Sequence, residues 1–128
     1  MTNAAPPSVT VVLIVEDEAL IRLVLADSLT EDGFEVIEAV HAADAIRLLG
    51  EHAVRVHALF TDVHMPGEMN GVALAHHTRS NWPWISILIT SGRAYPKADD
   101  MPTGALFVAK PYDLSEVARH IRESVRIL

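Results

Sequence analysis

Short apolar runs along this chain alternate with longer segments whose apolar residues recur at helical spacing. Residues 9–15, 56–61, 85–90 and 106–109 are short and nearly continuous in apolar side chains, which predicts strands buried on both faces of a sheet. Residues 34–40 instead alternate apolar with acidic side chains, so we expect a less buried strand at an edge of the sheet.

The intervening segments have the pattern of amphipathic helices. The spacing predicts helices over residues 19–31, 42–51, 72–80 and 115–127, with Ser115 as the N-cap of the last one. Residues 91–104 contain Pro96, Pro102 and two glycines, which oppose a long helix. We therefore expect the fourth of about five helices to be short or irregular.

Strands that alternate with helices at this spacing predict right-handed βαβ units and a parallel sheet, which is an α/β fold. Five strands alternating with helices in one chain of 128 residues indicate the smaller, flavodoxin-like doubly wound fold, with strand order 2-1-3-4-5 by analogy to that fold. We expect a disordered tail over residues 1–8 and a single domain over residues 9–128 without an output domain.

Composition narrows the class of protein further. The net charge is -7, which disfavours nucleic-acid binding, and the chain contains no cysteine, which excludes disulfides and thiol chemistry. No apolar run reaches the roughly 18 residues that a membrane span needs, and the first residues lack a secretory signal pattern. We expect a cytoplasmic protein that contacts neither nucleic acid nor membrane.

Charged residues follow three of the predicted strands directly. Glu16 and Asp17 end the first, Asp62 ends the third and Lys110 ends the last. Because the carboxyl ends of parallel strands share one edge of the sheet, we expect these side chains to meet in one pocket. Carboxylates suit Mg²⁺ (or Mn²⁺), a hard cation that also binds phosphate oxygens. With a metal present, a carboxylate such as Asp62 could attack phosphorus and form an aspartyl phosphate.

Two further groups at strand ends could contact such a phosphoryl group. The ammonium of Lys110 can pair with one phosphoryl oxygen, and the hydroxyl of Thr90, at the end of the fourth strand, can contact another. Ser91 is the second choice for that hydroxyl. The Lys110–Pro111 peptide bond is a candidate for the cis form, which X-Pro bonds adopt more readily than others.

Four segments, in this order, resemble the receiver domain of bacterial two-component response regulators: VVLIVEDEALIR, LFTDVHMPGEMNG, ILITSG and FVAKPYDLSEV. The resemblance covers nearly the whole chain. It implies a chemotaxis-regulator-like domain in Mg²⁺-dependent phosphorelay signalling. Its phosphodonor would be a sensor histidine kinase or a His-phosphotransfer protein, and its conformational switch would control a downstream protein. Such a domain is not a conventional enzyme, although it assists its own aspartyl phosphorylation and dephosphorylation.

Carried over residue by residue, the resemblance implies specific roles. By this resemblance, Asp62 is the phosphoacceptor and Lys110 is the lysine that the family carries beside it. Thr90 and Phe107 are the switch residues. The implied metal ligands are Glu16, Asp17, Asp62 and the backbone carbonyl of His64, with Asp17 the direct ligand of the acidic pair.

This sequence also departs from the common pattern of the family. Glu16 stands where aspartate is more frequent, and Phe107 lacks the hydroxyl of a tyrosine. The proline-rich segment 91–104 puts the usual helix-mediated dimerisation in doubt, so we expect a monomer or a weak dimer.

Three rival functions remain open at this point. A haloacid-dehalogenase-like phosphatase would carry its aspartate nucleophile after the first strand, where this chain has Glu16-Asp17-Glu18-Ala19. A flavin or nucleotide module would need a loop rich in Gly, Ser and Thr at that place. A receiver-like adaptor that works without phosphorylation would share the fold but not the chemistry.

Overall fold

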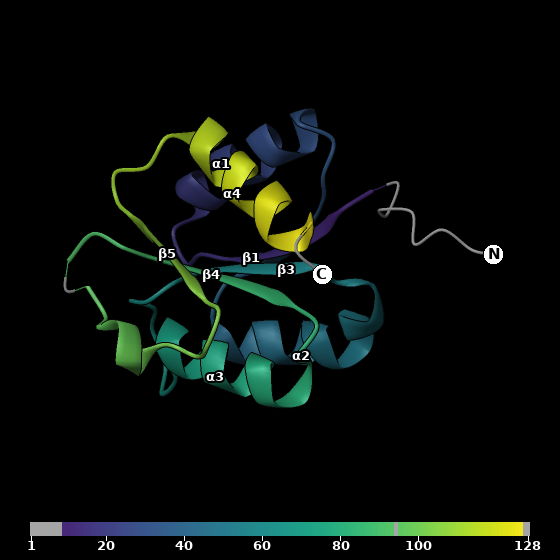
Figure 1. Ribbon diagram of the computed structural model, residues 1–128. Coiled ribbons are helices and arrows are strands. Elements are labelled where there is room, and N and C mark those ends of the chain that lie inside the picture. Colours follow the sequence, from purple (N-terminus) through teal and green to yellow (C-terminus); the bar gives the residue numbers. More distant parts are fainter. Residues whose placement is uncertain (1–8, 94, 127–128) are drawn as a thin grey trace.

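The computed structural model describes residues 9–93 and 95–126. Five parallel strands form one sheet in the order β2-β1-β3-β4-β5 (Figure 1). The strands are β1 (Val11–Val15), β2 (Glu35–Ala39), β3 (Ala58–Asp62), β4 (Ser86–Ser91) and β5 (Leu106–Ala109). The α-helices are α1 (Ala19–Glu31), α2 (Ala42–His52), α3 (Gly71–Asn81) and α4 (Leu114–Arg126). The strand order and the edge position of β2 confirm the predicted fold, and the predicted tail over residues 1–8 lies outside the described residues.

Helices cover both faces of the sheet. Figure 1 shows α1 and α4 on one face, here called the α1/α4 face, and α2 and α3 on the other, the α2/α3 face. Phe60 and Leu88 pack on the α1/α4 face with Ile121 of α4, whereas Leu59 packs on the α2/α3 face with Leu74 of α3. Since successive strand residues point to opposite faces, these cores fix the direction of every side chain in the central strands.

Several element ends differ from the prediction by one or two residues. β1 begins at Val11 rather than at residue 9, because its pairing with β2 starts there and Val9 is 44% exposed. β3 begins at Ala58 rather than at residue 56, since Val56 closes a 3-10 turn by donating its amide to the Ala53 carbonyl. β4 is shifted by one residue and ends at Ser91.

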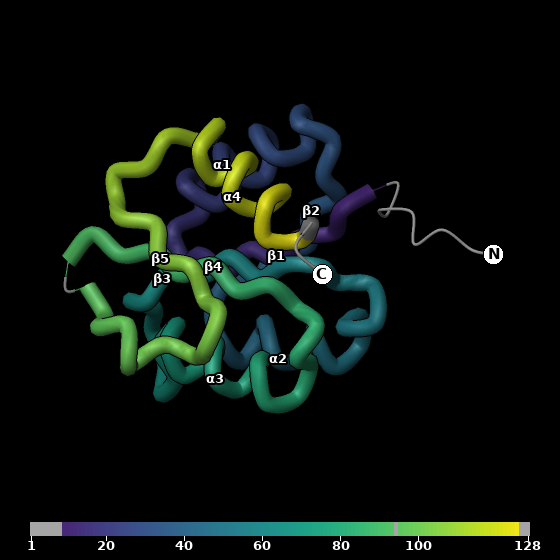
Figure 2. Tube along the Cα trace, viewed as in Figure 1, coloured from purple at the N-terminus to yellow at the C-terminus, as the bar shows by residue number. Residues whose placement is uncertain are grey.

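The segment between β4 and β5 holds no α-helix in its described residues. Its only helical element is a 3-10 turn over Ala98–Asp100, which is bound to α3 by a 2.7 Å hydrogen bond between His76 Nε2 and the Asp100 carbonyl. Figure 2 shows the segment as a long loop between the two strands. Prolines at 96 and 102 and a left-handed Gly104 (φ 84°) explain why a regular helix does not form. The expected irregular fourth helix is thus reduced to a single turn.

The last helix starts one residue earlier than predicted. Ser115 lies inside α4 rather than capping it, and the prediction of its N-cap role was wrong. The carboxylate of Asp113 accepts the Ser115 amide at 3.1 Å and its hydroxyl at 2.9 Å, while the Asp113 carbonyl accepts the amide of Val117. Asp113 therefore satisfies the helix start, because it stands one residue before Leu114 and its carboxylate accepts both donors of Ser115. The predicted end at residue 127 lies outside the described residues.

Candidate functional site

The acidic residues after β1 divide into one buried and two exposed carboxylates. Glu16 is 5% exposed, and its Oε2 accepts the amide of Glu18 at 3.0 Å. Its backbone is held from both sides, since the amide donates to the Ala39 carbonyl and the carbonyl accepts from Arg22. Burial raises the pKa of Glu16, against the lowering effect of the Glu18 amide and of a nearby lysine. Asp17, by contrast, is exposed at the sheet edge.

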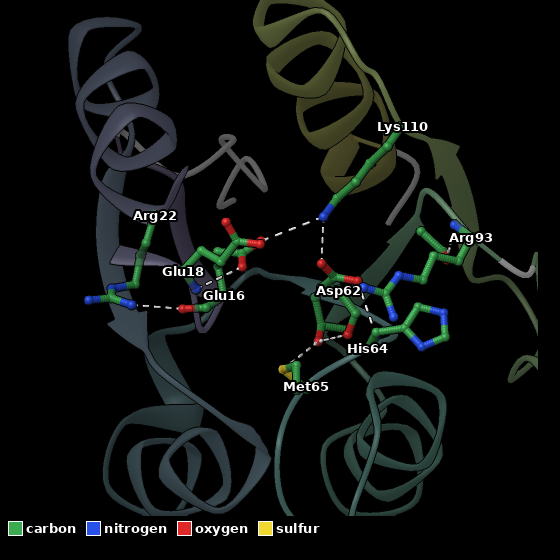
Figure 3. Close-up of polar contacts among 10 residues, drawn as sticks. Glu16, Glu18, Arg22, Asp62, His64, Met65, Arg93 and Lys110 are labelled. Atoms are coloured by element: carbon green, nitrogen blue, oxygen red, sulfur yellow. Dashed lines mark hydrogen bonds and ion pairs between the residues drawn. The ribbon is translucent and has the colours of Figure 1, made fainter. Parts of the chain in front are cut away.

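Asp62 is the last residue of β3 and is 6% exposed. Its Oδ1 accepts the backbone amide of His64 at 3.1 Å, and its Oδ2 accepts the ammonium of Lys110 at 2.5 Å (Figure 3). The two bonds engage both oxygens and fix the direction of the carboxylate. A carboxylate oxygen keeps further lone pairs after one such bond, so Asp62 can still bind a cation or attack an electrophile.

The backbone of Asp62 is packed against Gly71, the first residue of α3. A Cβ at position 71 would lie 1.9 Å from the Asp62 carbonyl oxygen, and the Gly71 amide donates to the Val63 carbonyl. Only glycine permits this approach, so Gly71 positions the end of β3. No pattern in the sequence indicates a part for Gly71 in the site, because the short distance that requires glycine appears only in three dimensions.

Lys110 follows β5 and reaches across the site. Its Nζ also lies 3.8 Å from Oε1 of Glu16, and its amide donates to the Ser91 carbonyl. Burial by itself would lower the pKa of Lys110, but the hydrogen bond and charge of Asp62, with the charge of Glu16, raise it. The side chain of Lys110 is therefore protonated and positively charged at neutral pH. Its peptide bond to Pro111 is cis, as the sequence analysis considered.

These side chains border one open pocket of about 590 Å³. Its lining includes Asp17, Asp62, His64, Arg93 and Lys110. The structure thus brings together the predicted acids and the predicted lysine, and it adds an arginine that the sequence analysis missed. Arg93 could have been found by the rule that found Asp17, since it comes two residues after the end of a strand that points to this edge.

Thr90 does not line this pocket. It is 2% exposed, and its hydroxyl has no hydrogen-bond partner among the described residues. Thr90 pairs in register with Asp62, and it has the same parity along β4 as Leu88, so its side chain points to the α1/α4 face.

Phe107 lies on the opposite face. It is half-buried, packs against Ile87 and Ile89 of β4, and contacts the ring of Tyr95 at 5.1 Å between centroids, with 55° between the ring planes. Ser91 has the parity of Ile89 and so shares this α2/α3 face with Phe107. The sheet therefore separates Thr90 from Phe107, and Ser91 and Phe107 lie on the same face.

The donor set fits Mg²⁺ or Mn²⁺. Among the residues that the structure describes, no three His, Asp or Glu side chains are grouped to hold a metal. Mg²⁺ does not need such a group, because it keeps several waters and takes one or two carboxylates plus phosphate oxygens. Asp17 and Asp62 line the same pocket, and the backbone of His64 stands beside them.

Basic residues elsewhere in the described chain are accounted for by internal contacts. Arg119 pairs with Glu123 at 2.9 Å, and Arg122 donates to the Asp32 carbonyl and lies over the ring of Phe34. Both of these arginines on α4 therefore have local partners within the chain. No helix in the described residues is long and apolar enough to cross a membrane.

Comparison with known proteins gives one consistent family. The sequence pattern described as "Response regulator receiver domain" matches residues 12–122. The chain is 33% identical to "Sensor kinase CckA" of Brucella abortus over 115 residues, which is 88% of this chain and 12% of that protein. It is 30% identical to "Chemotaxis protein CheY" of Bacillus subtilis over 118 residues, which is 89% of this chain and 96% of that protein.

Comparison with solved structures gives the same family. The crystal structure of the receiver domain from the hybrid histidine kinase CckA matches with a TM-score of 0.78 at 30% identity, and the match covers 90% of this chain and 98% of that one. The chain spans only a small part of the sensor kinase and about half of the length of a matching transcriptional regulator.

Proposed function

Because this chain belongs to the response regulator receiver domain family, we propose that it accepts a phosphoryl group on Asp62 and relays it as a change of conformation. The observation that carries the assignment of Asp62 is its contact with Lys110 in a pocket that Asp17 also lines. A buried carboxylate held by a lysine and a backbone amide, beside a second carboxylate, has the composition of a phosphoryl-acceptor site.

The transfer step balances simply. An oxygen of Asp62 attacks the phosphorus of a phosphohistidine, and the bond from phosphorus to the imidazole nitrogen breaks. The imidazole leaves with the bonding electron pair, and an acyl phosphate remains on Asp62. With acetyl phosphate as donor, the leaving group is acetate. The chain thus takes part in its own phosphorylation, and hydrolysis by water returns the carboxylate of Asp62 and inorganic phosphate.

The carboxylates explain why a divalent cation belongs to this site. Glu16, Asp17 and Asp62 would repel an anionic donor, and Mg²⁺ or Mn²⁺, when bound, supplies the positive charge that offsets this repulsion. We assign its direct ligands as Asp17, Asp62 and the backbone carbonyl of His64. Glu16, held behind them by the Glu18 amide, contributes charge from a partly desolvated position.

In this proposal, Lys110 stabilises the phosphorylated state of Asp62. Its ammonium now bonds to Oδ2 of Asp62, and after transfer it would bond to an oxygen of the phosphoryl group instead. That exchange of partners gives the switch a local cause. The hydroxyl of Ser91 would engage another oxygen and act on Phe107 across the α2/α3 face; Thr90, the first choice from sequence, remains the alternative.

An apolar surface beside the pocket supports docking of a protein phosphodonor. On α1, Leu20 is 77% exposed, and Leu23 and Val24 are each more than half exposed. This surface continues into a groove lined by Leu20, Val24, Tyr112 and Leu114. A histidine-bearing helix of a kinase or His-phosphotransfer protein laid on α1 would reach Asp62 from the pocket's open side. The name of the relative CckA, a sensor kinase, is compatible with such a donor.

The downstream partner and the compartment are also part of this proposal. A downstream protein would recognise the surface that phosphorylation changes, and the absence of cysteine is compatible with action in the cytoplasm.

Neither the phosphatase nor the adaptor alternative is favoured. The family is that of receiver domains, and the described chain retains both the acid pair and the lysine.

Intact-protein mass measurement with acetyl phosphate tests the proposal. Native protein with Mg²⁺ should gain one phosphoryl group, and it should gain none after metal chelation or with the Asp62→Asn substitution. Equal labelling of the native and substituted proteins would refute Asp62 as the acceptor. Failure of the native protein to be labelled by either acetyl phosphate or a phosphorylated histidine protein would favour the adaptor function.

A further inference from the structure

The guanidinium of Arg93 has no protein acceptor among the described residues, and it lines the pocket of Asp62. The other arginines whose side chains are described all donate to a carboxylate or a carbonyl. Those arginines are Arg22, Arg47, Arg55, Arg79, Arg119 and Arg122. An unpaired guanidinium in this pocket calls for an explanation by something that enters the pocket.

The backbone holds Arg93 at the pocket edge. Its amide donates to the hydroxyl of Ser91 at 3.3 Å, which fixes the chain just past the end of β4. Gly92 keeps the turn close to Lys110, because a Cβ at position 92 would lie 3.2 Å from the Lys110 Cβ. Figure 3 shows the side chain of Arg93 extending from this turn toward Asp62 and His64.

The charges in the pocket leave Arg93 available for a ligand. Lys110 is committed to Asp62 at 2.5 Å and lies near Glu16 at 3.8 Å. Arg93, although it shares the pocket with Asp17 and Asp62, forms no ion pair with them in the described structure. A ligand anion could therefore bind Arg93 without first breaking a protein contact.

We propose that Arg93 binds the phosphoryl group on Asp62 as a second cation beside Lys110. The proposal rests on the proposed function. A guanidinium offers a planar pair of N–H donors that matches two oxygens of one phosphoryl group, whereas the ammonium of Lys110 acts as a point charge on a single oxygen. Lys110 and Arg93 follow different strands, β5 and β4, so they would contact different oxygens of the group.

The test uses beryllium trifluoride, which bonds to a carboxylate oxygen and imitates a phosphoryl group. Its affinity for the native chain in the presence of Mg²⁺ would be measured by fluorine NMR, together with the acetyl phosphate concentration that gives half the maximal labelling rate. We expect Arg93→Ala to weaken analogue binding by about tenfold, in the range of a charged hydrogen bond at a partly exposed site. Arg93→Lys should recover part of the lost affinity for the analogue, because lysine keeps the positive charge but lacks the planar pair of N–H donors.

The matched control is Arg119→Ala, which removes another exposed arginine, on α4, and should leave analogue binding unchanged. If Arg93→Ala binds the analogue as tightly as the native chain does, and the native chain is labelled on Asp62, the role of Arg93 is overturned and the proposed function stands. If the native chain takes up neither acetyl phosphate nor the analogue, the proposed function falls and the role of Arg93 falls with it. An equal loss in the Arg119→Ala control would show a general charge effect and would also overturn the inference.

Discussion

The ammonium of Lys110 lies 2.5 Å from Oδ2 of Asp62, although 48 residues separate the two along the chain. The contact exists because β4 lies between β3 and β5 and all three strands end at the same edge. It joins a buried carboxylate to a cation whose pKa is raised, so each residue compensates the charge of the other.

Removal of Lys110 should therefore destabilise the fold as well as disturb the site. We expect Lys110→Ala to lower the free energy of unfolding by about 1 to 3 kcal/mol, because Asp62 would be left buried without its partner. In the double variant with Asp62→Ala the two losses should not add, and urea denaturation of the four proteins measures the coupling. Strictly additive losses would show that the pair contributes nothing to stability.

Gly71 should be as sensitive as a residue of the pocket itself. The Cβ of Gly71→Ala would overlap the Asp62 carbonyl oxygen at 1.9 Å, so we expect a loss of at least about 2 kcal/mol in unfolding free energy and slower labelling of Asp62. Gly50→Ala is the matched control, since no atom lies within 4 Å of its added Cβ inside α2. It should stabilise the fold by about 0.5 to 1 kcal/mol. Equal effects of the two substitutions would contradict this account of Gly71.

The two hydroxyls at the end of β4 can be told apart by substitution. Thr90→Val replaces a buried, unpaired hydroxyl with a methyl group, so we expect thermal stability to hold or rise slightly. NMR signals of Phe107 and Tyr95 should still respond to beryllium trifluoride in this variant. In Ser91→Ala the analogue should still bind, but the response of the two rings should be lost. The reverse result would return the switch role to Thr90.

How far the sequence predicted this structure depends on the kind of information each feature needs. Strand β5 and helix α1 have the predicted bounds, because their apolar patterns are unbroken and are bounded by Gly33 and Pro111. The meeting of Asp62 with Lys110 was predicted from strand ends alone, since a parallel sheet brings such ends to one edge.

Other features depend on register and on distances that no pattern encodes. The face of Thr90 follows from its parity with Leu88, and a run of nearly continuous apolar residues does not show which of them point to which face of the sheet. Gly71 lies against the backbone of Asp62, and Arg93 lines the same pocket as Asp62; both placements appear only in the folded chain. Ser115 was predicted as the N-cap, and Asp113, two residues earlier, is of a type that caps helices equally well.

A histidine outside the site gives the fold a predictable dependence on pH. His57 Nδ1 accepts the amide of Val11 at the start of β1, at 2.9 Å, and burial lowers the pKa of His57. The unfolded chain therefore binds the proton first. The contribution of His57 to stability is complete above its unfolded pKa of about 6.5 and is lost as the pH falls through the lower folded value.

Melting temperatures between pH 7.5 and 5 check this dependence. We expect the native protein to lose about 1 kcal/mol of stability over that range from this group alone, since protonation removes the acceptor of a buried amide. His57→Asn should show less of the loss, because the amide oxygen accepts a hydrogen bond at every pH. His52→Asn, which removes a half-exposed histidine at the end of α2, should keep the native dependence. Identical pH profiles for the native protein and His57→Asn would contradict the account.

The central claim is that Asp62 carries the phosphoryl group, and peptide mapping after borohydride reduction tests it most directly. Borohydride reduces an acyl phosphate to an alcohol, so a phosphorylated aspartate becomes homoserine while free carboxylates are left unchanged. After treatment with acetyl phosphate and Mg²⁺, we expect homoserine at position 62 and at no other acidic position. Homoserine at position 17, the five-carbon alcohol 5-hydroxynorvaline at position 16, or a phosphorylated chain with unmodified Asp62 would contradict the assignment.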